Sequence, residues 1–179
     1  MSGTYRSPLA PDANAGLVTL VTGGGTGLGR AVARAYARTG ARVAVAGRRA
    51  EPLEEVSAEL GAAGTEVLAV PGTDVREPDH VTALVDRVLE RFGRIDVLVN
   101  NAGGQFVATP ETISAKGWRA VHRLNVDAVG DLTRTVAERS MIPGDGGLVV
   151  FIGFSPRRGI PLMVHASAAR AALENLASG

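Results

Sequence analysis

The sequence predicts an α/β protein in which helices cover both faces of a parallel sheet. Short apolar runs of strand type alternate along the chain with longer segments of helical period, as in βαβ units. The runs are almost continuously apolar, as in LVTLV and VLV, which indicates strands buried on both sides in a doubly wound sheet. The expected strands are Leu17–Thr22, Arg42–Ala46, Glu66–Val70, Ile95–Asn100 and Leu148–Ile152.

The first three connecting segments have the apolar spacing of amphipathic helices and end near a glycine. The apolar spacing of the second and third helices follows Pro52 and Pro78, and each proline lies at an early helical position, which suits proline. In the first helix, four side chains are expected to face the sheet: Leu28, Val32, Ala35 and Tyr36.

The length of 179 residues and a hydrophobic share of 45% suit one globular domain. We expect this domain over residues 17–179, behind an N-terminal arm of residues 1–16 that has no apolar period. The chain has no cysteine, and its three histidines are far apart, so neither a disulfide framework nor a metal site is expected.

The charge pattern and the apolar pattern bear on partners and location. The formal net charge is +1, with the two signs interspersed, so no nucleic-acid partner is expected. The sequence lacks a signal-peptide pattern and an apolar run long enough to cross a bilayer. We therefore expect a soluble cytoplasmic protein that does not bind membranes.

A glycine cluster lies directly between the first expected strand and the first expected helix. Glycines there permit a tight turn and let the backbone approach a pyrophosphate, while the helix N-terminus offers free N–H groups. A flexible turn is the alternative, but the position at the start of a βαβ unit favours dinucleotide binding. The expected contacts are Gly23, Gly25, Thr26, Gly27, Leu28 and Gly29.

The end of the second strand indicates which dinucleotide is bound. An NAD-binding fold carries an acidic residue there for the ribose 2′-OH, whereas this sequence has Arg48 and Arg49. Guanidinium groups offer a 2′-phosphate charge-assisted hydrogen bonds, and no carboxylate repels it. The pattern therefore favours NADP, with two solvated arginines ahead of a helix as the alternative.

Further motifs make the sequence resemble the short-chain dehydrogenase/reductase family. They are the turn Thr22–Gly29, Asp74-Val75, Asn100-Asn101-Ala102-Gly103 and Asn125. The resemblance implies a Rossmann fold with strand order 3-2-1-4-5, adenine held by Asp74 and Val75, and cofactor along Asn101, Ala102 and Gly103. It also implies two more strands and a substrate loop beyond this sequence, and a homo-oligomer for the full-length protein.

The sequence is more closely similar to peroxisomal trans-2-enoyl-CoA reductases and their bacterial relatives. The matching segments are Val99–Phe106, Ser114–Trp118, Gly159–His165 and Ala168–Ala171. This resemblance implies an NADP(H)-dependent oxidoreductase that reduces the C=C bond of a conjugated enoyl thioester. The alternative is a truncated or catalytically impaired paralogue that binds a nucleotide or a partner without turnover.

The sequence departs from the wider family at the catalytic positions. Ala166 and Arg170 stand where the family has tyrosine and lysine, and the serine position falls near Phe154, with Ser155 beside it. A thioester enolate needs charge stabilisation more than a strong acid on oxygen, so a site without the phenol fits alkene reduction. The candidate catalytic residues are Asn125, His165 and Arg170, with Ser155 as a further pocket candidate.

Each candidate also has a structural interpretation. His165 has the titration range of a proton donor, but a lone histidine in an apolar stretch is more often structural. Arg170 stays protonated, so it would hold ribose hydroxyls or stabilise negative charge rather than donate a proton. Asn125 interrupts a patterned helix and would either shape the site or lie at the surface.

Overall fold

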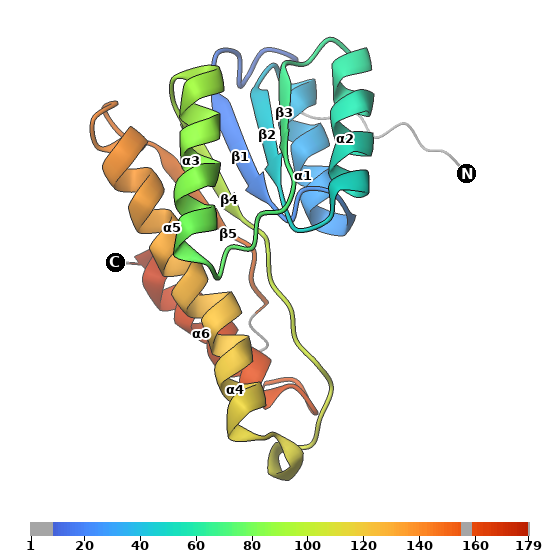
Figure 1. Cartoon of the computed structure of the whole chain (residues 1–179), viewed down its shortest axis with the longest axis vertical. Helices are drawn as coiled ribbons and strands as arrows, with labels where there is room; N and C mark the ends of the chain where they lie inside the picture. The colour runs from blue at the N-terminus through green and yellow to red at the C-terminus, as the bar shows by residue number, and fades with distance from the viewer. Residues whose placement is uncertain (1–8, 155–158, 179) are drawn as a thin grey trace.

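The computed structural model describes residues 9–154 and 159–178. Five parallel strands form one sheet in the order β3-β2-β1-β4-β5, which confirms the predicted topology (Figure 1). Each strand lies within two residues of its predicted bounds. The strands are β1 (Val18–Thr22), β2 (Arg42–Ala46), β3 (Val67–Val70), β4 (Val97–Asn100) and β5 (Leu148–Phe151).

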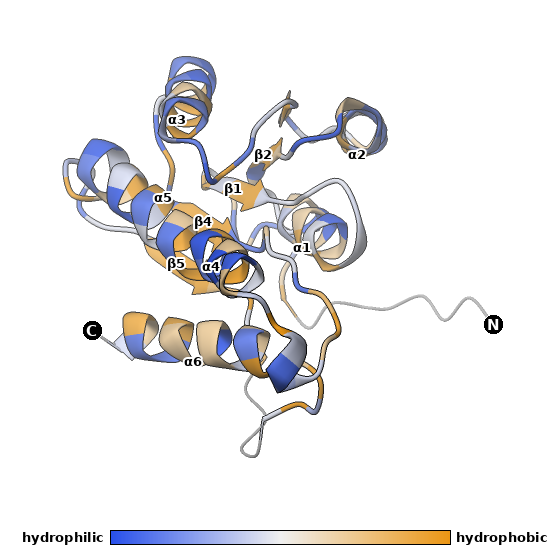
Figure 2. Ribbon diagram, turned by 60° about the horizontal axis from the view of Figure 1, so that its bottom comes forward, coloured by the Kyte–Doolittle hydropathy of each residue, from blue (hydrophilic) through white to orange (hydrophobic). Residues whose placement is uncertain are grey.

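Helices cover both faces of this sheet. Figure 2 shows α3 and α5 on one side of the sheet and α1 and α6 on the other. Two π-helical segments, η2 (Arg123–Asp127) and η3 (Ala137–Met141), follow α4 and α5 without a break in helical backbone. The other helices are α1 (Gly27–Arg38), α2 (Ala50–Ala62), α3 (Pro78–Phe92), the short 3-10 turn η1 (Pro110–Thr112), α4 (Ala115–His122), α5 (Ala128–Val136) and α6 (Val164–Ser178).

Alternate residues of each strand feed two separate cores. Val18 and Leu20 of β1 pack with α3 and α5, whereas Val21 of the same strand packs with α1 and α2. All five residues of β1 are buried, as expected for a central strand covered on both faces. The amphipathic spacing predicted for the third helix is confirmed, since α3 buries one apolar face: Val81, Leu84, Val85, Val88 and Phe92.

The packing face of α1 differs from the prediction. Leu28 is 67% exposed and Ala35 is exposed, whereas Gly29 and Ala33 are buried. The small residues let the helix lie close to the sheet. The side of the helix that carries them therefore faces the sheet, and Leu28 points outward. Val32 and Tyr36 pack against the core as expected. The expectation for Leu28 and Ala35 was wrong because it ranked side chains by hydrophobicity, while close approach selects for small size.

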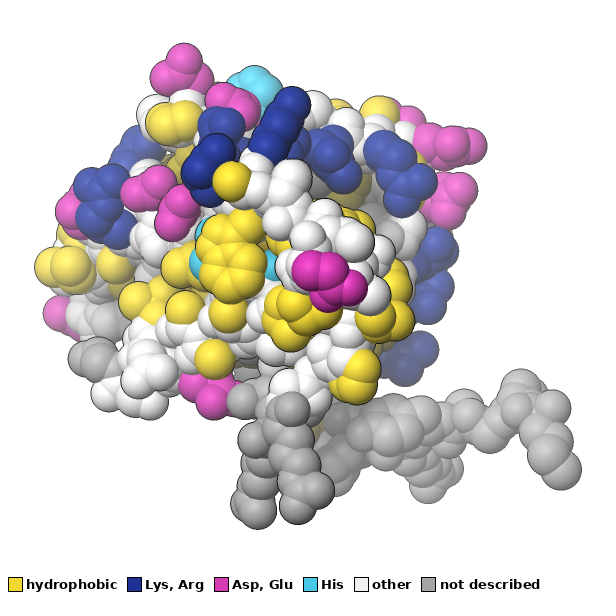
Figure 3. Space-filling view, turned by 90° about the horizontal axis from the view of Figure 1, so that it is seen from below, with side chains coloured by type: hydrophobic (Ala, Val, Ile, Leu, Met, Phe, Trp, Pro, Cys, Tyr) yellow, Lys and Arg dark blue, Asp and Glu magenta, His cyan; other side chains and the backbone are white. Residues whose placement is uncertain are grey.

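The lower part of the molecule extends beyond the carboxyl ends of the strands. It consists of the long segment after β4, helix α4 and the start of α6 (Figure 1). The N–H of Ala108 donates to the carbonyl of Leu162 over 3.0 Å, which ties the first of these segments to the last. Seen from this end, hydrophobic side chains gather in the middle of the face, with Lys and Arg at its rim (Figure 3). The exposed large hydrophobic residues of these segments are Phe106, Val107, Trp118, Leu162 and Val164.

Two features of the described residues concern the sheet edge and membranes. β5 forms one edge of the sheet and pairs only with β4 among the described strands, and Leu148 at its start is exposed. None of the described helices has the length and apolar character needed to cross a bilayer.

An ion-pair cluster joins α1 to α2 on the outer surface. Glu59 accepts hydrogen bonds from Arg34 Nε at 2.6 Å and from Arg30 Nη2 at 2.8 Å. The hydrogen bonds from Arg34 and then Arg30 lower the pKa of Glu59 from its usual 4.5 to about 2. The cluster therefore stays charged across the neutral range and holds the two helices together.

We predict that Glu59→Gln lowers the melting temperature at pH 7. Because the folded-state pKa is depressed, the stabilisation is present above pH 4.5 and is lost as pH falls toward 2. The difference between variant and wild type should therefore shrink over that range in thermal unfolding followed by circular dichroism. Glu54→Gln, an exposed change on the same helix, is the matched control. A difference that stays constant from pH 7 to pH 2 would contradict the ion-pair explanation.

Candidate functional site

The glycine turn lies where β1 meets α1, and geometry requires glycine at Gly23 and Gly29 among other positions. Gly23 has a φ of +64°, in the left-handed region that side chains disfavour. A Cβ at Gly29 would meet the carbonyl oxygen of Gly23 and Nδ2 of Asn101. The first turn of α1 is therefore pressed against the end of β1 and the segment after β4.

Thr22 and Asn101 hold that junction together. The Thr22 hydroxyl accepts from the N–H groups of Asn101 and Ala102 at 3.1 and 3.0 Å, and it donates to the Val99 carbonyl at 3.3 Å. The Asn101 amide donates to the carbonyls of Thr22 at 2.9 Å and Gly23 at 3.2 Å. The sequence motifs after β1 and β4 thus form one hydrogen-bonded unit, although about eighty residues separate them.

A cleft of about 430 Å³ opens at the carboxyl ends of the strands beside this unit. In doubly wound sheets, ligands bind at this edge, where the strand order reverses; here the reversal lies between β1 and β4. Gly29 lies beneath the turn and does not line the cleft. The other residues predicted to contact a cofactor all line it: Gly23, Gly25, Thr26, Gly27, Leu28, Arg48, Arg49, Asp74, Val75, Asn101, Ala102 and Gly103.

The cleft also has lining residues that the sequence analysis did not select. Arg76, Thr73 and Leu124 are the main ones. Arg76 could have been found from its place two residues after Asp74, in the same turn after a strand. Leu124 gave no such signal, because it reaches the cleft from η2 through the fold.

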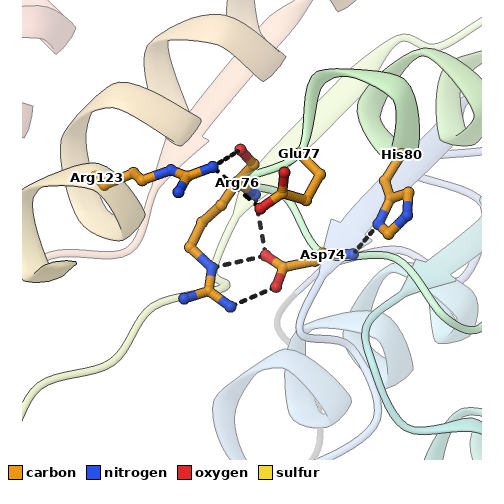
Figure 4. Close-up of polar contacts among 5 residues, drawn as sticks. All are labelled: Asp74, Arg76, Glu77, His80 and Arg123. Carbon is orange, nitrogen blue, oxygen red and sulfur yellow. Dashed lines mark hydrogen bonds and ion pairs between the residues drawn. The ribbon is translucent and has the colours of Figure 1, made fainter.

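The charged residues that line the cleft lie at its β2–β3 end, in the segments that follow these two strands. Asp74 accepts from Arg76 Nε at 2.9 Å and Nη2 at 2.5 Å, and from the Arg76 N–H at 3.1 Å (Figure 4). The Arg76 side chain, and to a smaller extent the charge of Arg48, lower the pKa of Asp74 to about 2. Neither Arg48 nor Arg49 has an ion-pair partner among the described residues. Two positive charges without a salt-bridge partner therefore border the cleft.

The loop that carries Arg76 is fixed on both sides. The His80 Nδ1 accepts from the N–H of Asp74 at 3.2 Å. On the other side, Arg123 of η2 donates to the Arg76 carbonyl at 3.1 Å and to Glu77 at 3.0 Å (Figure 4). These contacts connect the β3 loop to the helical segment that contains Asn125.

Asn125 is buried and uses its amide to fasten the segment after β4. Its Nδ2 donates to the carbonyls of Val121 and Gly104, both at 2.8 Å, and its Oδ1 accepts from the Gly104 N–H at 3.4 Å. The surface alternative is wrong, since the side chain is enclosed. The side-chain contact with the preceding turn coincides with the π-helical backbone of η2, a feature that often marks functional sites.

Arg170 lies buried on α6 beside the ends of β4 and β5. Its Nη1 donates to the Ile152 carbonyl at 2.5 Å, and its Nε has no hydrogen-bond partner within the described part of the chain. A Cβ at Gly103 would meet the Arg170 guanidinium and Asn125 Oδ1, so both groups flank this glycine. Burial lowers the pKa of Arg170 from its usual value, but a guanidinium remains protonated.

His165 is fully enclosed one turn before Arg170. Its ring lies 4.4 Å from the Phe106 ring, and neither ring nitrogen has a partner in the described residues. None of Asn125, His165 and Arg170 lines the cleft itself. Ala166, at the family's tyrosine position, is buried. Ser155 lies outside the described residues.

Metal ligands form no cluster in the described chain. No group of three or more histidine, cysteine, aspartate or glutamate side chains could hold a metal ion among residues 9–154 and 159–178.

The sheet order and the glycine turn define a nucleotide-binding fold of the doubly wound, Rossmann class. The model of the short chain dehydrogenase family matches residues 17–179. The chain therefore belongs to the short-chain dehydrogenase family.

Individual relatives align with most of this chain and are longer than it. A peroxisomal 2,4-dienoyl-CoA reductase of Arabidopsis thaliana is 32% identical over 178 residues, which cover 94% of this chain and 59% of the relative. The chain spans little more than half the length of such curated relatives. That relative is named as a peroxisomal enzyme. The cytoplasmic location expected for this chain stays a prediction.

Solved structures give the same family with similar coverage. A citronellol catabolism dehydrogenase of Pseudomonas aeruginosa PAO1 superposes with a TM-score of 0.89 at 37% identity, covering 96% of this chain and 70% of that one. A metagenomic short-chain oxidoreductase in complex with NADP has a TM-score of 0.85 at 32% identity, covering 92% of this chain and 74% of its own.

We predict that Gly29→Ala destabilises the fold by about 1–3 kcal/mol, because the methyl group overpacks the β1–α1 junction. Nucleotide affinity should fall with it, since the turn must move away from Asn101. Thermal unfolding and fluorescence titration measure the two effects. Gly130→Ala in α5 is the control: a Cβ there meets nothing within 4 Å, so it should stabilise by up to about 1 kcal/mol. If Gly29→Ala were as stable as the wild type, the close approach of α1 to the end of β1 would be absent.

Proposed function

We propose that this chain is the nucleotide-binding part of an NADP(H)-dependent oxidoreductase that reduces the C=C bond of a conjugated enoyl thioester. The observation that carries the proposal is the cleft with two unpaired arginines at its β2–β3 end. The 2,4-dienoyl-CoA reductases among its relatives support an unsaturated thioester as the substrate class.

The residues around the cleft fit a phosphorylated dinucleotide. The turn at Gly23–Gly29 leaves room for backbone contact with a pyrophosphate, and the N-terminus of α1 favours negative charge. Arg48 and Arg49 would hold the 2′-phosphate with charge-assisted hydrogen bonds. Asn101, Ala102 and Gly103 would lie along the cofactor, while Asp74 and Val75 would border the adenine.

NADPH bound in the cleft would supply a hydride for the β-carbon of the alkene. In this proposal Arg170 stabilises the negative charge that develops on the thioester oxygen, because its guanidinium remains charged although buried. Asn125 holds the Gly104 backbone in place and so shapes the site. The buried Ala166 offers no acid for an alkoxide, which favours alkene reduction over ketone reduction.

A second candidate function is nucleotide binding without turnover. One observation favours it: the Asn125 amide and the Arg170 guanidinium are engaged with backbone carbonyls, and His165 is enclosed behind Phe106. The two candidates differ in whether substrate reduction follows cofactor binding.

We predict that Arg48→Ala weakens NADPH binding by about 1.5–3 kcal/mol, the usual size of a hydrogen bond to a charged group. NADH binding should be almost unchanged, because NADH has no 2′-phosphate. Fluorescence titration of both dinucleotides measures the difference. Arg38→Ala, at the far end of α1, gives the same loss of charge and should affect neither dinucleotide. Equal losses for NADPH and NADH would contradict a phosphate contact.

We further predict that NADPH is oxidised with a trans-2-enoyl thioester and not with a simple ketone. A ketone places alkoxide charge on an oxygen that needs a proton donor at the position of Ala166, whereas solvent can protonate the α-carbon of an enolate. Arg170→Ala should lower kcat roughly 10²–10³-fold, as for a lost electrostatic donor. Absorbance of NADPH follows both reactions. NADPH binding without any turnover would select the second candidate, and equal rates on both substrates would contradict alkene reduction.

A further inference from the structure

The loop after β3 contributes a charge pair that faces the cleft. Asp74 and Arg76 both line the cleft, and both oxygens of the Asp74 carboxylate accept a hydrogen bond from the Arg76 guanidinium (Figure 4). A third bond comes from the Arg76 N–H. The pair is therefore a fixed part of the cleft wall rather than a transient surface contact.

Asp74 is the one acidic residue among those lining the cleft in the described chain. It lies close enough to Arg48 for that charge to lower its pKa further. A bare carboxylate at this place would repel a phosphate held by Arg48, because like charges in a partly desolvated site oppose each other. The bidentate contact with Arg76 cancels that charge before any ligand arrives.

Arg76 is held in position by residues outside the pair. Its carbonyl accepts from Arg123, which also binds Glu77, so the loop is tied to η2. The Asp74 N–H donates to His80 at the start of α3. Because both ends of the loop are anchored, the guanidinium meets Asp74 without a further loss of loop entropy.

We propose that Arg76 is a positioning residue that sets selectivity for the 2′-phosphorylated dinucleotide by neutralising Asp74. This inference rests on the proposed use of NADP(H). It assigns the preference for NADPH to two effects: Arg48 and Arg49 attract the phosphate, and Arg76 removes the repulsion that Asp74 would otherwise exert. Asp74 and Arg76 together are close to neutral, so loss of either partner leaves the charge of the other uncompensated beside the phosphate.

The test is a double-mutant cycle on the ratio of the dissociation constants of NADH and NADPH. Arg76→Ala should lower the ratio about tenfold at low salt, with a smaller effect at high salt. Asp74→Asn should raise the ratio, because the positive charge of Arg76 is then left uncompensated. The double variant Asp74→Asn with Arg76→Ala should return close to the wild-type ratio. Arg38→Ala controls for the change in net charge.

The outcomes separate this inference from the proposed function. If the wild type binds NADPH no more tightly than NADH, both fail. If the wild type prefers NADPH and Arg76→Ala keeps the same ratio while weakening both dinucleotides, Arg76 is only structural and this inference alone fails. Should Arg76→Ala not fold, Asp74→Asn still decides, because an unchanged or lower ratio in that variant also overturns the inference.

Discussion

The close approach of the first turn of α1 to the segment after β4 is the constraint on which the site depends. Gly29 lies where any side chain would strike the Gly23 carbonyl and the Asn101 amide. Because this contact is tight, Thr22 and Asn101 can join the ends of β1 and β4 by hydrogen bonds. The cleft takes its shape from that junction, since the glycine turn forms one wall and residues Asn101–Gly103 form another.

Two neighbouring arginines without a salt-bridge partner border the cleft. On the outer surface, Arg30 and Arg34 both pair with Glu59, and Arg139 pairs with Asp86. Arg48 and Arg49 have no such partner among the described residues. The described residues Arg38, Arg87 and Arg119 have none either, but they do not line the cleft. Exposed ion pairs add little stability, so the informative feature is the position of both arginines on the wall of the cleft rather than their lack of partners. That place is the end of β2, where a dinucleotide's ribose would lie.

The sequence predicted the sheet well because buried parallel strands leave a clear signal. The apolar runs predicted all five strands within two residues of their observed bounds, and the glycine turn identified the β1–α1 junction. Predictions that depended on relative packing were weaker. Leu28 was expected to face the sheet, yet the small residues Gly29 and Ala33 take that face. Spacing along a helix cannot show how closely the helix approaches its sheet.

The sequence did not predict contacts between segments that are far apart along the chain. The enclosure of His165 depends on Phe106, which lies in a segment without regular structure, and the place of Arg170 depends on Ile152 and Gly103. Arg76 was overlooked because its importance comes from Asp74 and from the tether to Arg123. The roles proposed for these residues therefore come from the fold rather than from any motif.

The most direct test of the account is a crystal structure of the chain with NADPH bound. The account predicts the pyrophosphate against the glycine turn and the 2′-phosphate within hydrogen-bonding distance of the Arg48 guanidinium. It also predicts that the Asp74–Arg76 pair stays closed beside the phosphate. A nucleotide bound outside the cleft, or one whose 2′-phosphate points into solvent away from Arg48 and Arg49, would contradict it.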